Sequence, residues 1–88
     1  MNLQIDKSFE KDFKKYRNKS LNKKLLVLLH EIQEAKKLSE IRNIKKLKGT
    51  SDFYRIRISD FRIGLIKSKN DITLIRFLHR KDIYKYFP

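Results

Sequence analysis

Five of the seven arginines of this chain lie after residue 52, and three of them have the spacing of a β-sheet face. In the stretch DFYRIRISDFRIG, Asp52 to Gly64, apolar residues alternate with Arg55, Arg57 and Arg62. This alternation predicts a β-hairpin with one apolar face and one arginine face, which carries these three side chains. Like charges on neighbouring strands destabilise a sheet, whereas a guanidinium matches the geometry of a phosphate. We therefore expect the arginine face to bind an external anion.

The predicted hairpin fixes which arginines meet. A two-residue turn at residues 59–60 places Arg57 opposite Arg62, and Arg55 opposite Gly64, with open space beside Arg55. A half-exposed sheet face is polar in many proteins, so a single arginine there is an ordinary surface residue. The cluster favours an anion site, because few carboxylates are available to neutralise it. From residue 53 onward they are only Asp60, Asp71 and Asp82.

The composition points to a polyanionic partner. Eighty-eight residues, 40% of them hydrophobic, predict one folded domain over residues 1–88. The net charge of +13 attracts nucleic acid most strongly. Twelve of the 16 lysines lie in residues 1–52. We expect a general basic coat of lysines and a separate, specific arginine site.

Several classes of function are excluded by what the sequence lacks. There is no cysteine and there are only two histidines, so neither a disulfide framework nor a cysteine zinc site can form. No segment approaches 18 apolar residues, and the charged start MNLQIDKSFEK is unlike a signal peptide. We expect a cytoplasmic protein with no membrane partner. Metal-dependent nucleases need several converging carboxylates, which the arginine face does not offer.

RNA provides a route to strand cleavage that needs no metal or other cofactor. Its 2′-OH can attack the adjacent phosphodiester if a base removes the proton, cations stabilise the phosphate and an acid protonates the leaving 5′-oxygen. The arginines meet the requirement for cations. The candidates for proton transfer are His79, Tyr84 and Tyr86.

The first half of the chain is expected to support the sheet. Residues 3–5 can form a short strand, and two helices follow, capped by Ser8 and Ser20. Asp12 falls in the favourable first turn of the first helix. Apolar residues recur at helical spacing in both helices, which predicts a helical hairpin. They are Phe9, Phe13 and Tyr16 in the first helix and Leu21, Leu25, Leu28, Leu29 and Ile32 in the second.

Residues 36–48 are expected to be a lysine-rich connection. Its lysines at positions 45, 46 and 48 are either a solvated surface or contacts to RNA, and the residues alone leave both readings open. A third strand, ITLIRFLHR, follows the hairpin. We expect the register that buries Ile75 and Phe77, because it puts Arg76 and Arg80 on the arginine face. The last residues, KDIYKYFP, predict a short helix that packs through its apolar side chains.

The segments LKG, YRIRI, DFRIG and the terminal HRKDIYKYF, in this order behind a strand and a helical hairpin, resemble the RelE/ParE superfamily of type II toxins. The resemblance implies a small α+β fold in which a curved antiparallel sheet packs against the N-terminal helical hairpin, with a short C-terminal helix. It also implies an acidic, RelB-like antitoxin as partner. RelE-like members cleave mRNA in the ribosomal A site without metal, so mRNA and ribosomal RNA are further implied partners.

Site residues follow from the resemblance by position. Arginines stand where RelE-like strands often carry lysines, and an arginine is a poor general base, which makes His79 the more plausible proton-transfer group. The C-terminal tyrosine of the family, which can stack on a base, corresponds best to Tyr84. The implied catalytic residues are Arg55, Arg57, Arg62, His79, Arg80 and Tyr84. The expected RNA contacts are Lys45, Lys46, Lys48, Arg76, Lys81 and Tyr86.

Three functions remain open from the sequence. The first is a ribosome-dependent endoribonuclease of a type II toxin–antitoxin system, which the arginine cluster favours. The second is a ParE-like toxin that inhibits DNA gyrase through protein contacts. The third is a non-catalytic RNA- or DNA-binding module, for which the charge alone suffices.

Overall fold

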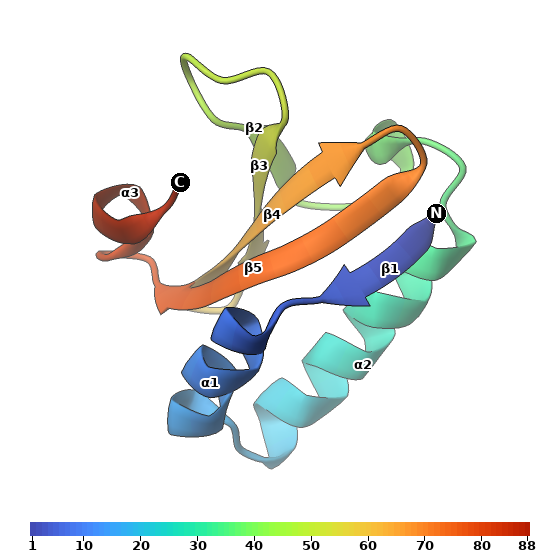
Figure 1. Cartoon of the computed structure of the whole chain (residues 1–88). Coiled ribbons are helices and arrows are strands. Elements are labelled where there is room, and N and C mark those ends of the chain that lie inside the picture. Colours follow the sequence, from blue (N-terminus) through green and yellow to red (C-terminus); the bar gives the residue numbers. More distant parts are fainter.

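The computed structural model describes residues 1–88 as a five-stranded sheet with helices on both faces. Figure 1 shows α1 and α2 side by side along one side of the sheet, and α3 apart from them near the end of β5. This is the predicted α+β architecture. In chain order the elements are β1 (Asn2–Ile5), α1 (Lys7–Tyr16), α2 (Lys19–Glu34), the 3₁₀ turn η1 (Leu38–Glu40), β2 (Ile44–Lys46), β3 (Phe53–Ile58), β4 (Phe61–Ser68), β5 (Asp71–His79) and α3 (Ile83–Tyr86).

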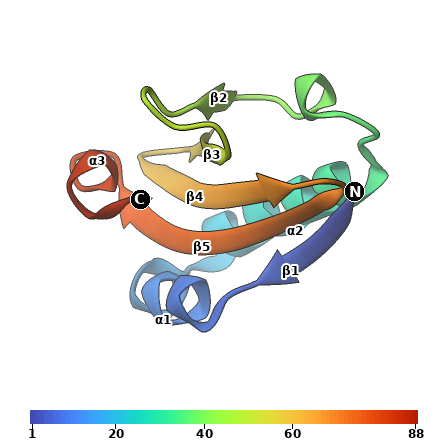
Figure 2. The ribbon, with the colours of Figure 1, turned by 45° about the horizontal axis from the view of Figure 1, so that its top comes forward.

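The strands lie in the order β1-β5-β4-β3-β2, which can be followed across Figure 2. The hairpin register is as predicted: Arg57 pairs with Arg62, and Arg55 with Gly64. The sheet is antiparallel except at one edge, where β1 pairs with β5 in parallel. This exception arises because the two helices carry the chain across the sheet between β1 and the remaining strands.

Both helices begin earlier than the sequence analysis expects. The N-cap of α1 is Asp6, whose carboxylate accepts from the backbone N–H of Ser8, and the N-cap of α2 is Asn18, whose side chain accepts from Leu21 N. The expected caps, Ser8 and Ser20, therefore lie inside the helices. No helix of the protein is long and apolar enough to cross a membrane.

The main core lies between the sheet and the two long helices. The side chains of Ile32, Ile63, Leu65 and Phe77 are wholly inaccessible to solvent. The ring of Phe77 also meets Phe13 edge to face, with ring centroids 4.9 Å apart. Burial of this apolar surface fixes which face of the hairpin is turned to the helices, so the arginines must lie on the other face.

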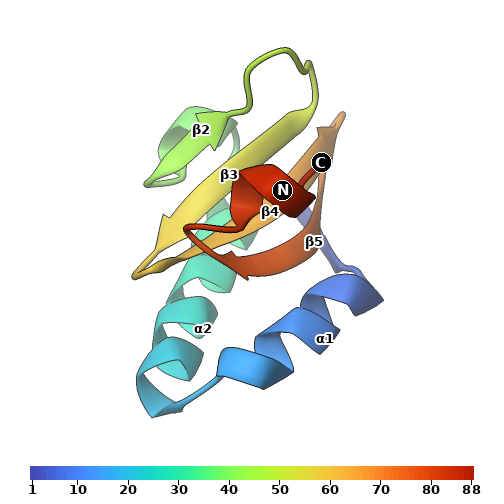
Figure 3. The same cartoon turned by 90° about the vertical axis from the view of Figure 1, so that its left-hand side faces the viewer.

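A second, smaller core covers part of the opposite face. Leu47, Leu78, Ile83 and Phe87 are buried together there, and Figure 3 gives a view in which α3 stands clear of α1 and α2. The prediction of open space beside Arg55 is wrong. The ring of Phe87 occupies it, since a Cβ atom on Gly64 would lie 2.7 Å from that ring.

The lysine-rich connection contains a strand that the sequence analysis missed. Strand β2 pairs Ile44 with Ile56 and Lys45 with Arg55. It has three residues and lies at the edge of the sheet. Short, lysine-rich edge strands resist pairing with other chains, and such a brief alternation is easily read as a loop.

Candidate nucleic-acid interface

Arg62 lies at the centre of a group of cations. Burial is the largest cause that lowers the pKa of Arg62, and the charges of Arg55, Arg57 and Arg80 lower it further. Tyr84 is close enough to act on the same group in the opposite direction. The structure therefore brings together five of the six predicted catalytic residues. We call them the arginine site (Arg55, Arg57, Arg62, Arg80 and Tyr84).

The guanidinium of Arg62 is held by the hairpin turn. Its Nη1 donates to the carbonyl oxygens of Ser59, at 3.2 Å, and of Phe61, at 2.9 Å. Ser59 adopts φ +54°, the left-handed conformation that tight hairpin turns need at their first central residue. The other nitrogens of Arg62 make no hydrogen bond within the protein and can donate to a ligand.

The two arginines of β3 are held by Asn43, in the loop before β2. Nη1 of Arg55 donates to the carbonyl oxygen of Asn43 at 3.0 Å, and Nη2 of Arg57 donates to its side-chain oxygen at 3.2 Å. Nε of Arg55 is buried without a hydrogen-bond partner. Asn43 is a functional residue that the sequence does not single out, and its one signal is that asparagine tolerates the left-handed conformation in turns.

Arg80 and Tyr84 reach the arginine site from the chain after β5. The backbone N–H of Arg80 donates to the carbonyl of Asp60 at 2.8 Å, which ties this turn to the tip of the hairpin. Tyr84 follows the fully buried Ile83 in α3 and is 66% exposed. An exposed ring beside a group of guanidiniums can stack on a base while the cations hold the adjoining phosphate.

None of the arginines of the arginine site forms an ion pair. The two ion pairs of the protein join Arg42 to Glu31 and Arg76 to Asp12. No cluster of three or more His, Cys, Asp or Glu side chains with the arrangement of a metal site is present. The chemistry that these residues can supply is the stabilisation of negative charge by unpaired guanidiniums.

The predicted lysines of the connection border the arginine site. Lys45, Lys46 and Lys48 line a pocket of about 390 Å³ together with Tyr84 and Phe87. Lys45 also pairs with Arg55 across the two strands and so shares its face. A basic pocket beside an exposed aromatic ring is suited to the backbone of a single-stranded nucleic acid.

The predicted register holds at Arg76, which pairs with Gly64 across β4 and β5 and so shares its face, but its guanidinium turns away from the arginine site toward α1. Its Nε donates to Asp12 Oδ2 at 2.6 Å, and the same oxygen accepts the backbone N–H of Phe77 at 3.0 Å. Asp12 is 5% exposed and lies on α1, where it caps the part of β5 that extends beyond β1. The prediction that Ile75 is buried beside Phe77 is wrong, because Ile75 is an extra residue between the pairs of β4 and β5, so strict alternation fails there. Ile75 consequently packs on the second core rather than beside Phe77.

The structure also separates His79 from the arginines. His79 pairs with Phe61, and their rings meet edge to face at 5.7 Å. Phe61 packs on the main core, on the helix side of the sheet. The Nδ1 atom of His79 accepts from the backbone N–H of Lys81 at 3.2 Å. Lys81 and Tyr86 are exposed around the last turn and α3, and neither lines the basic pocket.

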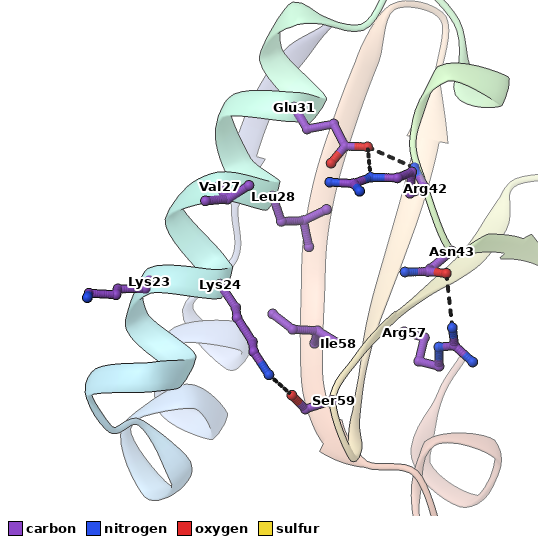
Figure 4. A pocket seen from close by; sticks show the side chains of 10 residues that line it. All are labelled: Lys23, Lys24, Val27, Leu28, Glu31, Arg42, Asn43, Arg57, Ile58 and Ser59. Atoms are coloured by element: carbon purple, nitrogen blue, oxygen red, sulfur yellow. Dashed lines mark hydrogen bonds and ion pairs between the residues drawn. The ribbon is translucent and has the colours of Figure 1, made fainter.

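A second pocket, of about 410 Å³, lies on the other side of Arg57, between α2 and the loop before β2 (Figure 4). Val27, Leu28 and Ile58 are its apolar lining residues, and Arg57 also lines it. Opposite Arg57, Lys24 donates to the hydroxyl of Ser59 at 2.6 Å. Arg57 therefore belongs both to the lining of this pocket and to the arginine site.

Comparisons with known proteins agree with the fold. Residues 3–84 match the family model described as ParE toxin of type II toxin-antitoxin system, parDE. The chain belongs to the RelE/ParE family of type II toxins. It is 37% identical to Toxin RelE3 of Methanocaldococcus jannaschii, over the whole of both chains.

Solved structures agree with this assignment of the toxin. A RelB-RelE antitoxin-toxin complex from Methanococcus jannaschii contains a chain with 36% sequence identity and a TM-score of 0.80, over 97% of this toxin and 99% of that chain. A RelE-RelB complex from Pyrococcus horikoshii OT3 has a TM-score of 0.73 at 22% identity, over 90% and 93% of the two chains, and so shows the fold alone. The predicted superfamily and fold class are confirmed.

Proposed function

We propose that this toxin is a ribosome-dependent endoribonuclease that cleaves mRNA in the ribosomal A site by attack of the RNA 2′-OH. The observation that carries the proposal is the convergence of three unpaired arginines and one exposed tyrosine around Arg62, which is itself unpaired. A plain nucleic-acid module needs only a diffuse positive surface. Unneutralised guanidiniums that crowd one another, two of them partly buried, are suited to the charge of a pentacoordinate phosphate.

In this mechanism the arginines do most of the chemistry. Arg62 and Arg80 contact the scissile phosphate, and Arg55 and Arg57 hold a phosphate or orient the base. Tyr84 stacks on a base beside the cut site. With His79 on the other face, the proton of the 2′-OH passes to water as the 2′-oxygen bonds to phosphorus, and the leaving 5′-oxygen takes a proton from water as its bond to phosphorus breaks. The rate arises from alignment of the 2′-OH and from electrostatic stabilisation, rather than from a histidine base.

We further propose that an acidic, RelB-like antitoxin inhibits the toxin. The net charge of +13 and the absence of ion pairs in the arginine site favour a negatively charged partner. The two relatives named above were solved as complexes of RelE with RelB. The antitoxin either covers the arginine site or displaces the chain from Lys81 onward, so that Tyr84 leaves its position.

The deciding experiment is cleavage in a translating extract. We expect the purified toxin to cut mRNA on the ribosome and to leave a 2′,3′-cyclic phosphate. Replacement of the 2′-OH at the cut site by hydrogen should abolish cleavage, because the nucleophile is then missing. Cleavage that persists on the 2′-deoxy substrate would disprove the mechanism.

A second candidate function is inhibition of DNA gyrase, which the match to the ParE family model favours. Such a toxin acts through protein contacts, so its activity does not require the arginine site. Supercoiling by purified gyrase, measured with the toxin and with its Arg62→Ala variant, separates the two. Inhibition by both proteins, with no cleavage of mRNA, would favour the gyrase target.

A further inference from the structure

We infer that Asn43 is a positioning residue, which fixes the orientation of Arg55 and Arg57 in the arginine site. The inference deepens the proposed function, on which its kinetic test rests. The carbonyl oxygen of Asn43 accepts from Nη1 of Arg55 at 3.0 Å and from the backbone N–H of Arg57 at 3.1 Å. The side-chain oxygen of Asn43 accepts from Nη2 of Arg57 at 3.2 Å, the contact drawn in Figure 4. One residue thus holds two of the four cations.

The backbone of Asn43 explains why an asparagine suits this position. Its φ is +64°, in the left-handed region. Asparagine enters this region more readily than most residues, whereas branched side chains are strained there. Glycine also adopts it freely, but glycine offers no side-chain oxygen to Arg57.

Neighbouring contacts keep Asn43 in place. Ile41 is 3% exposed, and the backbone N–H of Arg42 donates to Oε1 of Glu31 on α2 at 2.9 Å. On the other side, Ile44 begins β2 and pairs with Ile56. The loop is therefore fixed to both α2 and β3, so Asn43 can hold the guanidiniums in one position instead of following their motion.

The neutrality of the amide matters as much as its position. Arg55 and Arg57 lie near Arg62 and repel it, so unheld side chains would swing out toward water. A carboxylate at position 43 would hold Arg57 more firmly, but it would cancel one positive charge of the site. The two oxygens of Asn43 restrain the cations and leave their charge available to a phosphate.

Two substitutions separate these contributions. Asn43→Gly keeps the backbone conformation and the carbonyl that holds Arg55, and removes only the oxygen that holds Arg57. We expect single-turnover cleavage of ribosome-bound mRNA to slow about tenfold, the loss of one charged hydrogen bond, with affinity for a 2′-deoxy RNA close to wild type. Asn43→Asp should instead weaken that affinity and lower its salt slope by about one.

A double-mutant cycle tests whether Asn43 acts through Arg57. In an Arg57→Ala protein, Asn43→Gly should have no further effect on the cleavage rate, because the side chain that it orients is gone. If Asn43→Gly slows the Arg57→Ala protein as much as it slows the wild type, the positioning role is refuted. Urea unfolding of all four proteins distinguishes this result from a loss of stability.

A second readout does not depend on cleavage. In ¹H–¹⁵N spectra, we expect the side-chain Nε–H signal of Arg57 to report restricted rotation in the wild type and free rotation in Asn43→Gly, with the Arg55 signal unchanged. An unchanged Arg57 signal would refute the positioning role even in a protein that does not cleave RNA. Failure of the wild type to cleave would refute the proposed function and leave this spectroscopic result to stand by itself.

Discussion

The ring of Phe87 fills the space that Gly64 leaves on the sheet, directly beside Arg55. A Cβ atom on Gly64 would lie 2.7 Å from this ring, and Phe87 is 4% exposed. Phe53 meets the same ring edge to face at 5.5 Å. The absence of a side chain at Gly64 thus lets the C-terminal segment pack on the sheet. Because Tyr84 and Phe87 belong to this segment, the position of Tyr84 depends on Gly64.

Gly64→Ala should therefore destabilise the toxin. The new methyl group overlaps the ring of Phe87, and such overpacking costs about 1 to 3 kcal/mol. Urea unfolding measures this loss. In a Phe87→Ala background the same change should cost much less, since the ring that it meets is absent. Equal costs in both backgrounds would contradict the contact.

Arg62→Ala should abolish most of the activity and leave the fold intact. We expect the reaction to lose about 2.7 to 4 kcal/mol of transition-state stabilisation, and so to slow, by analogy with the removal of one oxyanion donor. Relief of the repulsion from Arg57 should keep the free energy of unfolding near or above that of the wild type. Wild-type toxicity in a folded Arg62→Ala protein would exclude Arg62 from the reaction.

Asp12→Ala should instead destabilise the fold and leave cleavage by the folded protein unchanged. Asp12 is buried and accepts from Nε and Nη2 of Arg76 and from the backbone N–H of Phe77, so its removal deprives three donors of their acceptor. The Phe77 N–H is buried, and leaving such a group unsatisfied costs about 1 to 3 kcal/mol. Arg76→Gln should cost less, because its guanidinium is partly exposed. Neither change should slow cleavage by the folded protein at low temperature, since both residues lie outside the arginine site.

Comparison of His79→Ala with Tyr84→Ala tests whether His79 transfers a proton in the reaction. We expect His79→Ala to leave the rate of cleavage within a few-fold of wild type, because His79 lies on the helix side of the sheet. Tyr84→Ala should slow cleavage markedly through lost stacking, worth about 1 to 3 kcal/mol per base. A large loss of rate in His79→Ala, without a loss of stability, would restore histidine as the proton-transfer group.

Asp6 should make stability dependent on pH in acid. The side-chain hydrogen bond of Ser8, followed by its backbone N–H, lowers the pKa of Asp6 from its ordinary value near 3.8. The stabilisation is fully present above that value and is lost as the pH falls through the lower pKa of the folded state. Asp6→Asn keeps an N-cap that does not titrate, so the stability difference between the two proteins should shrink in acid. Melting temperatures from about pH 5 to pH 2 measure it.

The hairpin of β3 and β4 could be predicted from the sequence because its strict alternation and two-residue turn leave one register. The position of Ile75 could not, because one bulge in β5 changes the faces of the residues before it. Asp12 was read as an ordinary helix-start residue, since its partner Arg76 lies 64 residues away. Contacts of this kind depend on how the helices cross the sheet, which local periodicity does not specify.

The sequence predicts the arginines of the site, but not the residue that holds two of them in position. Arginines that crowd one another without carboxylates are visible in the sequence. Asn43 orients two of them from a loop, and its role depends on a backbone angle and on a neighbouring strand. His79 shows the reverse case, because it has suitable chemistry but lies on the wrong face.

Strand β1 is the first element of the chain, and its partner β5 is the last strand. The backbone N–H of Asp6 donates to the carbonyl of Leu74 at 2.9 Å, and α1 packs on β5 as well. Pairings between such distant segments form slowly during folding, because a long loop must close before any contact repays it. A chain that ends before β5 lacks the strand that pairs with β1 and the core residues that β5 contributes. It therefore exposes apolar surface that proteases and chaperones recognise. We therefore expect the complete arginine site to form only after β5 has paired, because Arg80 and Tyr84 lie in the chain that follows β5.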